Sequence, residues 1–145
     1  PNDYITREEF VKLAVGLMNI QFSSANSSFA DVDNSAWYAP YVNAAFDAGI
    51  INGYSENSFG VGEFISRQDV AVILNRIHKL ENSSNKLTFA DHTDISDYAK
   101  SAVDNLSSAG VINGSNGSFM PKSNCTRAEV ACMVYRIMNL MGEGE

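Results

Sequence analysis

Apolar residues recur at helical spacing in three segments of the chain. In each segment they fall at positions i, i+3, i+4 and i+7, which places them on one face of a helix of about fifteen residues. The three sets are Phe10, Leu13, Ala14 and Leu17; Val70, Ile73, Leu74 and Ile77; and Val130, Met133, Val134 and Ile137. A hydroxyl residue with an acid three positions later precedes each set, in the pairs Thr6 and Glu9, Ser66 and Asp69, and Thr126 and Glu129. The pattern therefore predicts three helices that each begin with a capping box.

A second kind of helix is predicted over about 36–48 and again over about 96–109. Trp37, Tyr41, Ala45 and Ala48 share one face of the first, and Tyr98, Ala102, Leu106 and Ala109 share one face of the second. Both segments end in Ala-Gly, followed by a short apolar pair and Asn-Gly, which is typical of a helix stop and a tight turn. Polar connectors occupy 23–28 and 81–86. The predicted fold class is all-α, with long structured loops.

The same elements return at a constant interval along the chain. Arg7, Arg67 and Arg127 are evenly spaced, and Phe29-Ala30-Asp31 returns after the same interval as Phe89-Ala90-Asp91. The segment Gly49–Gly53 returns one position late, as Gly110–Gly114, so the third copy gains a residue before its glycine segment. The chain therefore divides into the second half of a first unit at 1–28, a second unit at 29–88 and a third unit at 89–145.

These motifs resemble the S-layer homology domain. The resemblance rests on the Phe-Ala-Asp segments, on Trp37, on the glycine segments, on Phe59 and Phe119, and on the tetrads Ser66–Asp69 and Thr126–Glu129. It implies a pseudo-threefold helical assembly that anchors a larger exported protein to the cell wall from outside the cell. The implied partner is a secondary wall polysaccharide attached to peptidoglycan, often pyruvylated and held in grooves between units. It also implies that the tetrad arginine faces the acidic sugar, which carries over to Arg127 and Arg67, and to Arg7, beside which Glu8 adds a negative charge.

Composition excludes several other classes of protein. The chain carries a net charge of −7, which argues against a nucleic-acid or anionic-membrane binder. No apolar run approaches a membrane span, and no signal peptide is expected from the start at Pro1. Asn and Ser are abundant, which suits a sugar partner and turn-rich loops alike. The two cysteines, Cys125 and Cys132, are predicted to be apolar fillers on one helix, too far apart for a disulfide.

The repeated arginine is unusual on physical grounds alone. It follows the N-cap, and the positive end of the helix dipole disfavours a cation in the first turn. A bound anion would change that cost into a gain, because free amides and the guanidinium would converge on it. The alternative is that the arginine pairs with an aspartate such as Asp31 or Asp91 and ties the units together. Arg76 and Arg136 are predicted to lie near helix ends and to be structural.

The other candidates have simpler explanations. The acids Glu9, Asp69 and Glu129 are capping residues, and the glycines are turn residues, with a groove floor as the alternative for Gly53 and Gly114. Trp37 and Tyr98 are predicted to pack in the core, with stacking on a sugar as the alternative. Residues 31–35 imitate a calcium loop but lack its glycine and its final glutamate. His78 and His92 have no partners at catalytic or metal-binding spacing, so neither an enzyme nor a cofactor nor a metal is expected.

The sequence thus predicts a noncatalytic anchor that binds an anionic wall polysaccharide. The residues predicted to contact it are Arg127, Arg67, Arg7, Gly53, Gly114, Asp31, Asp91 and Trp37. A helical-repeat module for protein interaction or self-assembly is the alternative function.

Overall fold

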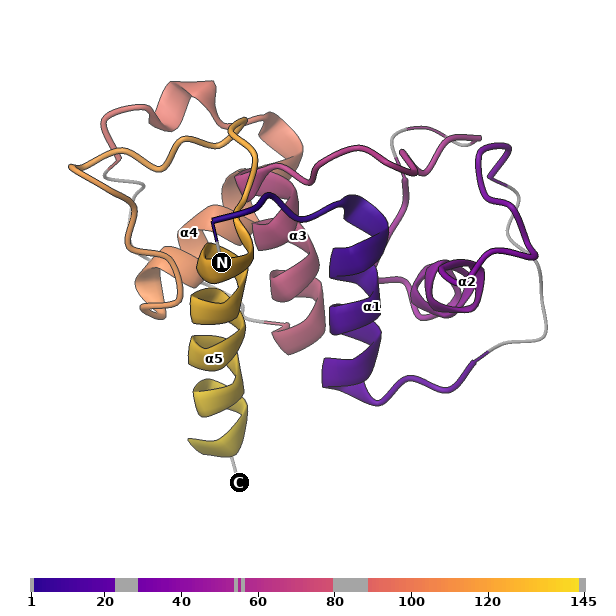
Figure 1. Ribbon diagram of the computed structural model, residues 1–145. Helices are drawn as coiled ribbons and strands as arrows, with labels where there is room; N and C mark the ends of the chain where they lie inside the picture. Colours follow the sequence, from indigo (N-terminus) through magenta and orange to yellow (C-terminus); the bar gives the residue numbers. More distant parts are fainter. Residues whose placement is uncertain (1, 23–28, 54, 56, 80–88, 144–145) are drawn as a thin grey trace. The chain divides into compact units, whose positions relative to one another are not determined.

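A computed structural model describes residues 2–22, 29–53, 55, 57–79 and 89–143. Its elements are α1 (Arg7–Met18), α2 (Ala39–Asp47), α3 (Arg67–His78), η1 (His92–Asp94), η2 (Asp97–Ala99), α4 (Lys100–Ser108) and α5 (Arg127–Glu143), where η1 and η2 are short 3-10 helices (Figure 1). Within the described ranges β pairing is limited to isolated bridges between single residues. The all-α prediction is therefore confirmed. The connectors expected at 23–28 and 81–86 lie outside the described residues.

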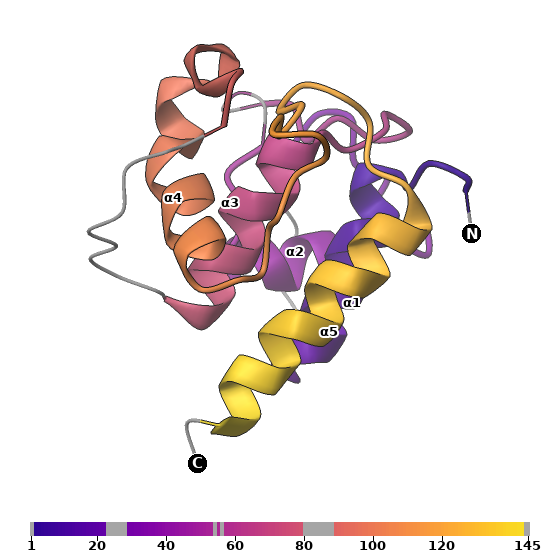
Figure 2. The same ribbon diagram turned by 90° about the vertical axis from the view of Figure 1, so that its left-hand side faces the viewer.

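The chain forms two compact units that do not follow the sequence repeat. The smaller unit is Ile5–Phe64, and the larger unit combines Pro1–Tyr4 with Ile65–Glu145. In the smaller unit α1 packs against α2, which is seen nearly end-on in Figure 1. In the larger unit α3 packs against α4 and α5, as Figure 2 shows. The smaller unit therefore joins α1 of the first repeat to α2 of the second, and the larger unit joins α3 of the second repeat to α4 of the third.

The predicted helix starts are confirmed at their caps. The Thr6 hydroxyl accepts from the Glu9 amide at 3.3 Å, and the Glu9 carboxylate accepts from the Thr6 amide at 3.0 Å. Thr126 and Glu129 form the same capping box at the start of α5. Ser66 accepts from the amide of Asp69, whose carboxylate in turn accepts from the hydroxyl of Tyr98 at 2.5 Å. These local bonds satisfy amides that would otherwise lack partners in the first helical turn.

The core follows most of the predicted apolar stripes. All four positions of the α3 stripe are buried, as are Val130, Met133 and Ile137 on α5. On α1 the prediction is wrong for Leu13, which is 48% exposed, because the buried face turns toward Val11 and Val15.

The second kind of helix begins later than predicted. Helix α2 starts at Ala39, and α4 starts at Lys100 after the separate turn η2. Trp37 is therefore 55% exposed and Tyr98 is 62% exposed, so the prediction that they pack in the core is wrong. Both residues lie before the first residue of their α-helix. Helical spacing therefore does not decide which way their side chains point. Ala45 on α2 and Ala102 and Leu106 on α4 are buried as predicted, and Val42 and Val103 are further core positions.

The cysteines also differ from expectation. Cys125 precedes α5 rather than lying on it and is buried, whereas Cys132 lies on α5 and is exposed. Only Cys125 is therefore the predicted apolar filler. His92 opens η1.

Three backbone bonds link the repeats in cyclic order. The amide of Arg7 donates to the carbonyl of Glu63 at 2.9 Å, and the amide of Arg67 donates to that of Ser123 at 3.0 Å. The amide of Arg127 donates to the carbonyl of Asp3 at 2.8 Å. Asp3, Glu63 and Ser123 occupy the same position in successive repeats. The same bond is therefore made from the first repeat to the second, from the second to the third, and from the third to the first.

Candidate functional site

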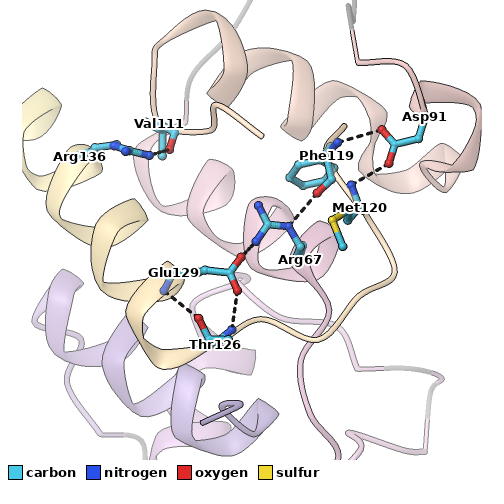
Figure 3. A network of polar contacts seen from close by, with 8 residues as sticks. All are labelled: Arg67, Asp91, Val111, Phe119, Met120, Thr126, Glu129 and Arg136. Carbon is cyan, nitrogen blue, oxygen red and sulfur yellow. Dashed lines mark hydrogen bonds and ion pairs between the residues drawn. The ribbon is translucent and has the colours of Figure 1, made fainter. Parts of the chain in front are cut away.

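The arginine of the second tetrad is held by the larger unit on three sides. Arg67 Nε donates to the carbonyl of Phe119 at 2.8 Å, and its guanidinium carbon lies 5.4 Å from the centre of the Phe119 ring. Its Nη1 forms an ion pair with Glu129 (Figure 3). With only 13% of the side chain exposed, Arg67 is held in place by the packing of α3 against α5 and the loop before it.

Glu129 has two different partners for its two carboxylate oxygens. Oε1 accepts from the Thr126 amide at 3.2 Å and completes the cap of α5, while Oε2 faces Arg67 (Figure 3). The cation at the start of α3 is thus compensated by an acid from the start of α5. The alternative to anion binding was that the arginine pairs with an aspartate. The ion pair of Arg67 forms with Glu129 and not with Asp91.

The amides at the start of α3 are already in use. The Arg67 amide donates to Ser123, the Gln68 amide donates to the carbonyl of Pro121 at 2.9 Å, and the Asp69 amide donates to the Ser66 hydroxyl. The prediction that free amides at this helix end would hold an anion is therefore wrong at α3. An anion in the larger unit must be held by side chains or by other amides.

The aspartates Asp31 and Asp91 organise the loops of their units. Asp31 accepts from the amides of Phe59, Gly60 and Val61 at 2.8–3.0 Å. Desolvation raises the pKa of Asp31, but these amides together hold the pKa below its ordinary value.

Asp91 repeats this arrangement. It accepts from the amides of Phe119 and Met120 at 2.9 and 2.8 Å (Figure 3). Desolvation raises the pKa of Asp91, while the two amides and the nearby charge of Arg67 lower it below its ordinary value. Each aspartate therefore fixes the loop whose carbonyl accepts from an arginine.

Arg7 reproduces the Arg67 arrangement in the smaller unit. Its Nε donates to the carbonyl of Phe59 at 2.9 Å, and its guanidinium carbon lies 5.3 Å from the Phe59 ring centre. The neighbouring Glu8, expected to add negative charge at the site, accepts from the Gly62 amide at 3.0 and 3.1 Å. Arg7 and Glu8 are both buried, whereas Arg127 is exposed at the start of α5.

Gly53 and Gly114 are required by two separate features. Their φ angles are +81° and +72°, in the region that disfavours side chains. A Cβ on Gly53 would also lie 2.6 Å from the ring of Phe29, and one on Gly114 would lie 2.6 Å from the ring of Phe89. The turn role predicted for these glycines is confirmed, and close packing on a phenylalanine is an additional cause.

A pocket of about 450 Å³ opens beside Arg67 in the larger unit. Three charged side chains line it: Arg67, Glu129 and Arg136. The remaining polar side chains of the lining are neutral: Tyr4, Asn113, Ser115, Ser118, Ser123, Asn124 and Thr126. Because Glu129 is paired with Arg67, the pocket keeps one positive charge in excess, in a chain whose net charge is −7.

Arg136 is the functional candidate that the sequence-based predictions missed. Helix α5 continues to Glu143, so Arg136 lies within the helix and not near its end, which corrects the prediction. Its Nη1 donates to the carbonyl of Val111 at 3.2 Å, and the residue lines the pocket (Figure 3). Arg76, at the same position of the preceding repeat, does lie in the last turn of α3 as predicted. The sequence pattern did not show how far α5 continues, and this length is what places Arg136 inside the helix.

The structure divides the predicted site residues between the two units. Arg67 and Gly114 line the pocket, and Asp91 holds its wall through the amides of Phe119 and Met120. Arg127 belongs to the larger unit and is not among the residues that line the pocket. The remaining four belong to the smaller unit: Arg7, Asp31, Trp37 and Gly53.

Two kinds of feature are absent from the part of the chain that the structure describes. No three of its histidine, cysteine or acidic side chains gather closely enough to hold a metal ion. None of its helices combines the length and the apolar character needed to cross a membrane.

Comparisons with known proteins agree on one family. The S-layer homology domain matches residues 28–71 and 88–131. An amylopullulanase of Thermoanaerobacterium thermosulfurigenes is 35% identical over 98% of this chain, and the exoglucanase XynX of Acetivibrio thermocellus is 35% identical over 95% of it. The surface-layer 125 kDa protein of Lysinibacillus sphaericus is 29% identical over 94% of it.

The matched region is a small part of each of these relatives. It spans 8%, 13% and 12% of their respective lengths. Proteins with different names therefore share this stretch. The chain belongs to the family of S-layer homology domains, noncatalytic modules that anchor proteins outside the cell at the cell wall or surface layer.

Proposed function

We propose that the chain anchors its parent protein by binding an acidic secondary polysaccharide of the cell wall, and that the pocket beside Arg67 is one site of contact. The excess positive charge of this pocket carries the proposal. A chain with net charge −7 does not attract an anionic polymer at long range. A local cation set among neutral polar groups selects a sugar with an acidic substituent at short range.

The two arginines would have different roles. Arg67 is already bonded to Phe119 and Glu129, so it shapes the pocket and supplies positive potential. Arg136 donates to the Val111 carbonyl through Nη1, and it is the cation that we assign to the carboxylate of the ligand. A guanidinium matches the geometry of a carboxylate, including the carboxylate of a pyruvate ketal.

The neutral lining suits the rest of a sugar. The side chains of Asn113, Ser115 and Ser118 and those of Ser123, Asn124 and Thr126 present hydroxyl and amide groups. Such groups donate and accept hydrogen bonds with the hydroxyls of a pyranose ring. The roles of Arg7 and Arg127 in binding stay predictions from the sequence.

The test compares Arg136→Met with Arg76→Met. Both substitutions keep most of the side-chain length and remove one positive charge at the same position of successive repeats. Arg76 is not among the residues that line the pocket, so it is the matched control. Retention is measured by sedimentation with wall sacculi that carry the secondary polymer and with sacculi stripped of it.

The expected result is retention of the unsubstituted chain by intact sacculi only. Arg136→Met should weaken this retention about tenfold, the effect of losing a charge-assisted contact of about 1.4 kcal/mol. Arg76→Met should be retained as before. Equal retention by both kinds of sacculi would contradict the proposal and would favour the alternative, a protein-interaction module.

A further inference from the structure

Partly exposed aromatic side chains gather in the smaller unit, where α1 packs against α2. The group consists of Phe22, Trp37 and Tyr41 together with Lys12, and is called the aromatic platform below. The rings of Phe22 and Tyr41 meet edge to face with centres 5.1 Å apart, and the centres of Trp37 and Tyr41 are 6.4 Å apart. Phe22 is 58% exposed and Trp37 is 55% exposed, so much of this surface faces solvent.

A cation lies over the platform. Lys12 Nζ is 5.8 Å from the centre of the Trp37 ring and 5.7 Å from that of Tyr41. These distances are within the range of cation–π attraction, which holds the ammonium beside the rings while leaving it hydrated. The platform therefore combines an apolar surface with one positive charge.

The next repeat does not carry an aromatic cluster with a cation at the corresponding helix positions. Helix α1 corresponds to α3 in the next repeat, and α2 corresponds to α4. One core position agrees in the two units, since Val42 and Val103 are both fully buried. The platform positions differ, because the exposed Lys12 corresponds to the buried Val72 and Tyr41 corresponds to the buried Ala102.

The remaining aromatic position is used differently in the two units. Trp37 corresponds to Tyr98, whose hydroxyl donates to Asp69 and accepts from Gln68 at 3.1 Å. In the larger unit this side chain is therefore bonded to α3 by its polar end. In the smaller unit the ring belongs to an exposed cluster with a cation.

We infer that the aromatic platform is a second binding site, which takes a pyranose ring of an acidic polysaccharide. The apolar face of the sugar stacks on Trp37, and the ammonium of Lys12 pairs with the acidic substituent. An exposed aromatic cluster marks a binding surface, and its single positive charge complements an anionic glycan. The inference rests on the proposed function for the class of ligand but uses different residues, in the other unit.

The platform contains its own reporter, because Trp37 is the one tryptophan of the sequence. The probe is the polysaccharide released from wall sacculi by mild acid. If a sugar stacks on Trp37, titration with this probe should move the emission to shorter wavelength and reduce quenching by acrylamide. Unchanged emission at saturating polysaccharide would overturn the inference, whatever the Arg136 variant does.

Substitutions give a second and independent measurement. Trp37→Ala should lower the affinity for intact sacculi by about tenfold, as loss of a stacking contact does. Trp37→Phe should retain part of the affinity, and it keeps the test readable if the alanine variant does not fold. Tyr135→Ala is the control, because Tyr135 is an exposed ring that belongs neither to the platform nor to the pocket lining.

Lys12→Gln separates stacking from charge. It should leave the shift of the Trp37 emission in place and make the affinity less sensitive to salt, since one ion pair is lost. Equal losses for Trp37→Ala and Tyr135→Ala would overturn the inference. An emission shift that stripped sacculi produce equally would also overturn it, because the occupant would then not be the acidic polymer.

Discussion

The carboxylate of Glu129 joins the start of its own helix to the guanidinium of Arg67. Oε1 completes the cap of α5, and Oε2 pairs with an arginine at the start of α3 (Figure 3). The glutamate of the third repeat's tetrad therefore also holds the arginine of the second repeat's tetrad in place.

A double-mutant cycle should show this coupling. Arg67→Ala, Glu129→Gln and the double variant are expected to give a coupling energy of about 1 kcal/mol, as for contacting residues of a partly exposed ion pair. Arg67→Ala alone should cost about 1–3 kcal/mol, because it also leaves the Phe119 carbonyl without its donor. Urea unfolding monitored by circular dichroism provides the free energies. Strictly additive losses would show that the pair contributes nothing.

Two of the glycines of the third repeat should differ sharply in their tolerance of alanine. Gly110 and Gly114 both have positive φ, but a Cβ on Gly110 meets nothing within 4 Å. Gly110→Ala should cost about 1 kcal/mol from backbone strain alone. Gly114→Ala should cost about 3 kcal/mol or more, because its Cβ would also lie 2.6 Å from the carbonyl oxygen of Ser118. Equal melting temperatures for the two variants would contradict this account.

Acid should weaken the loops that Asp31 and Asp91 organise. The folded-state pKa of each is below its ordinary value, so each contributes stability that is complete above a pH of about 4 and is lost as the pH falls through the folded pKa. Asp91→Asn should be less stable than the unsubstituted chain at neutral pH. The difference should close in acid, measured as the urea midpoint against pH. Asp47→Asn, at the exposed end of α2, is the control.

The two cysteines should react at very different rates. Burial raises the pKa of the Cys125 thiol, against an opposing effect of Arg67, whereas Cys132 is exposed. Iodoacetamide should therefore modify one thiol in the folded chain and two after unfolding, as mass spectrometry can count. Because Cys132 lines the pocket, bound polysaccharide should slow its alkylation. Fast modification of Cys125 in the folded chain would contradict the buried position.

The features that the sequence predicted correctly depend on near neighbours. The capping boxes of Thr6 and Thr126 involve residues three positions apart, and the stripe of α3 is a pattern within one helix. The capping boxes and the stripe both follow from local geometry. The fold class and the helix starts could therefore be predicted from the sequence without knowledge of tertiary contacts.

The incorrect predictions concern contacts between distant residues or the ends of elements. Arg67 obtains its partners from a loop and a helix that follow much later in the chain, and no local rule selects Glu129 over Asp91. Trp37 counted as a core residue only because α2 was predicted to begin too early. Arg136 counted as a helix-end residue only because α5 was predicted to end too soon.

The bond from Arg67 to Phe119 has a practical consequence for dividing this chain. A cut at the sequence boundary just before Phe89 would leave the guanidinium on one fragment and its carbonyl acceptor on the other. A cut immediately before Ile65 keeps both together and retains the larger compact unit except for Pro1–Tyr4. For gene fusions that transfer the pocket to another protein, the fragment 65–145 is therefore a better choice than the third repeat by itself.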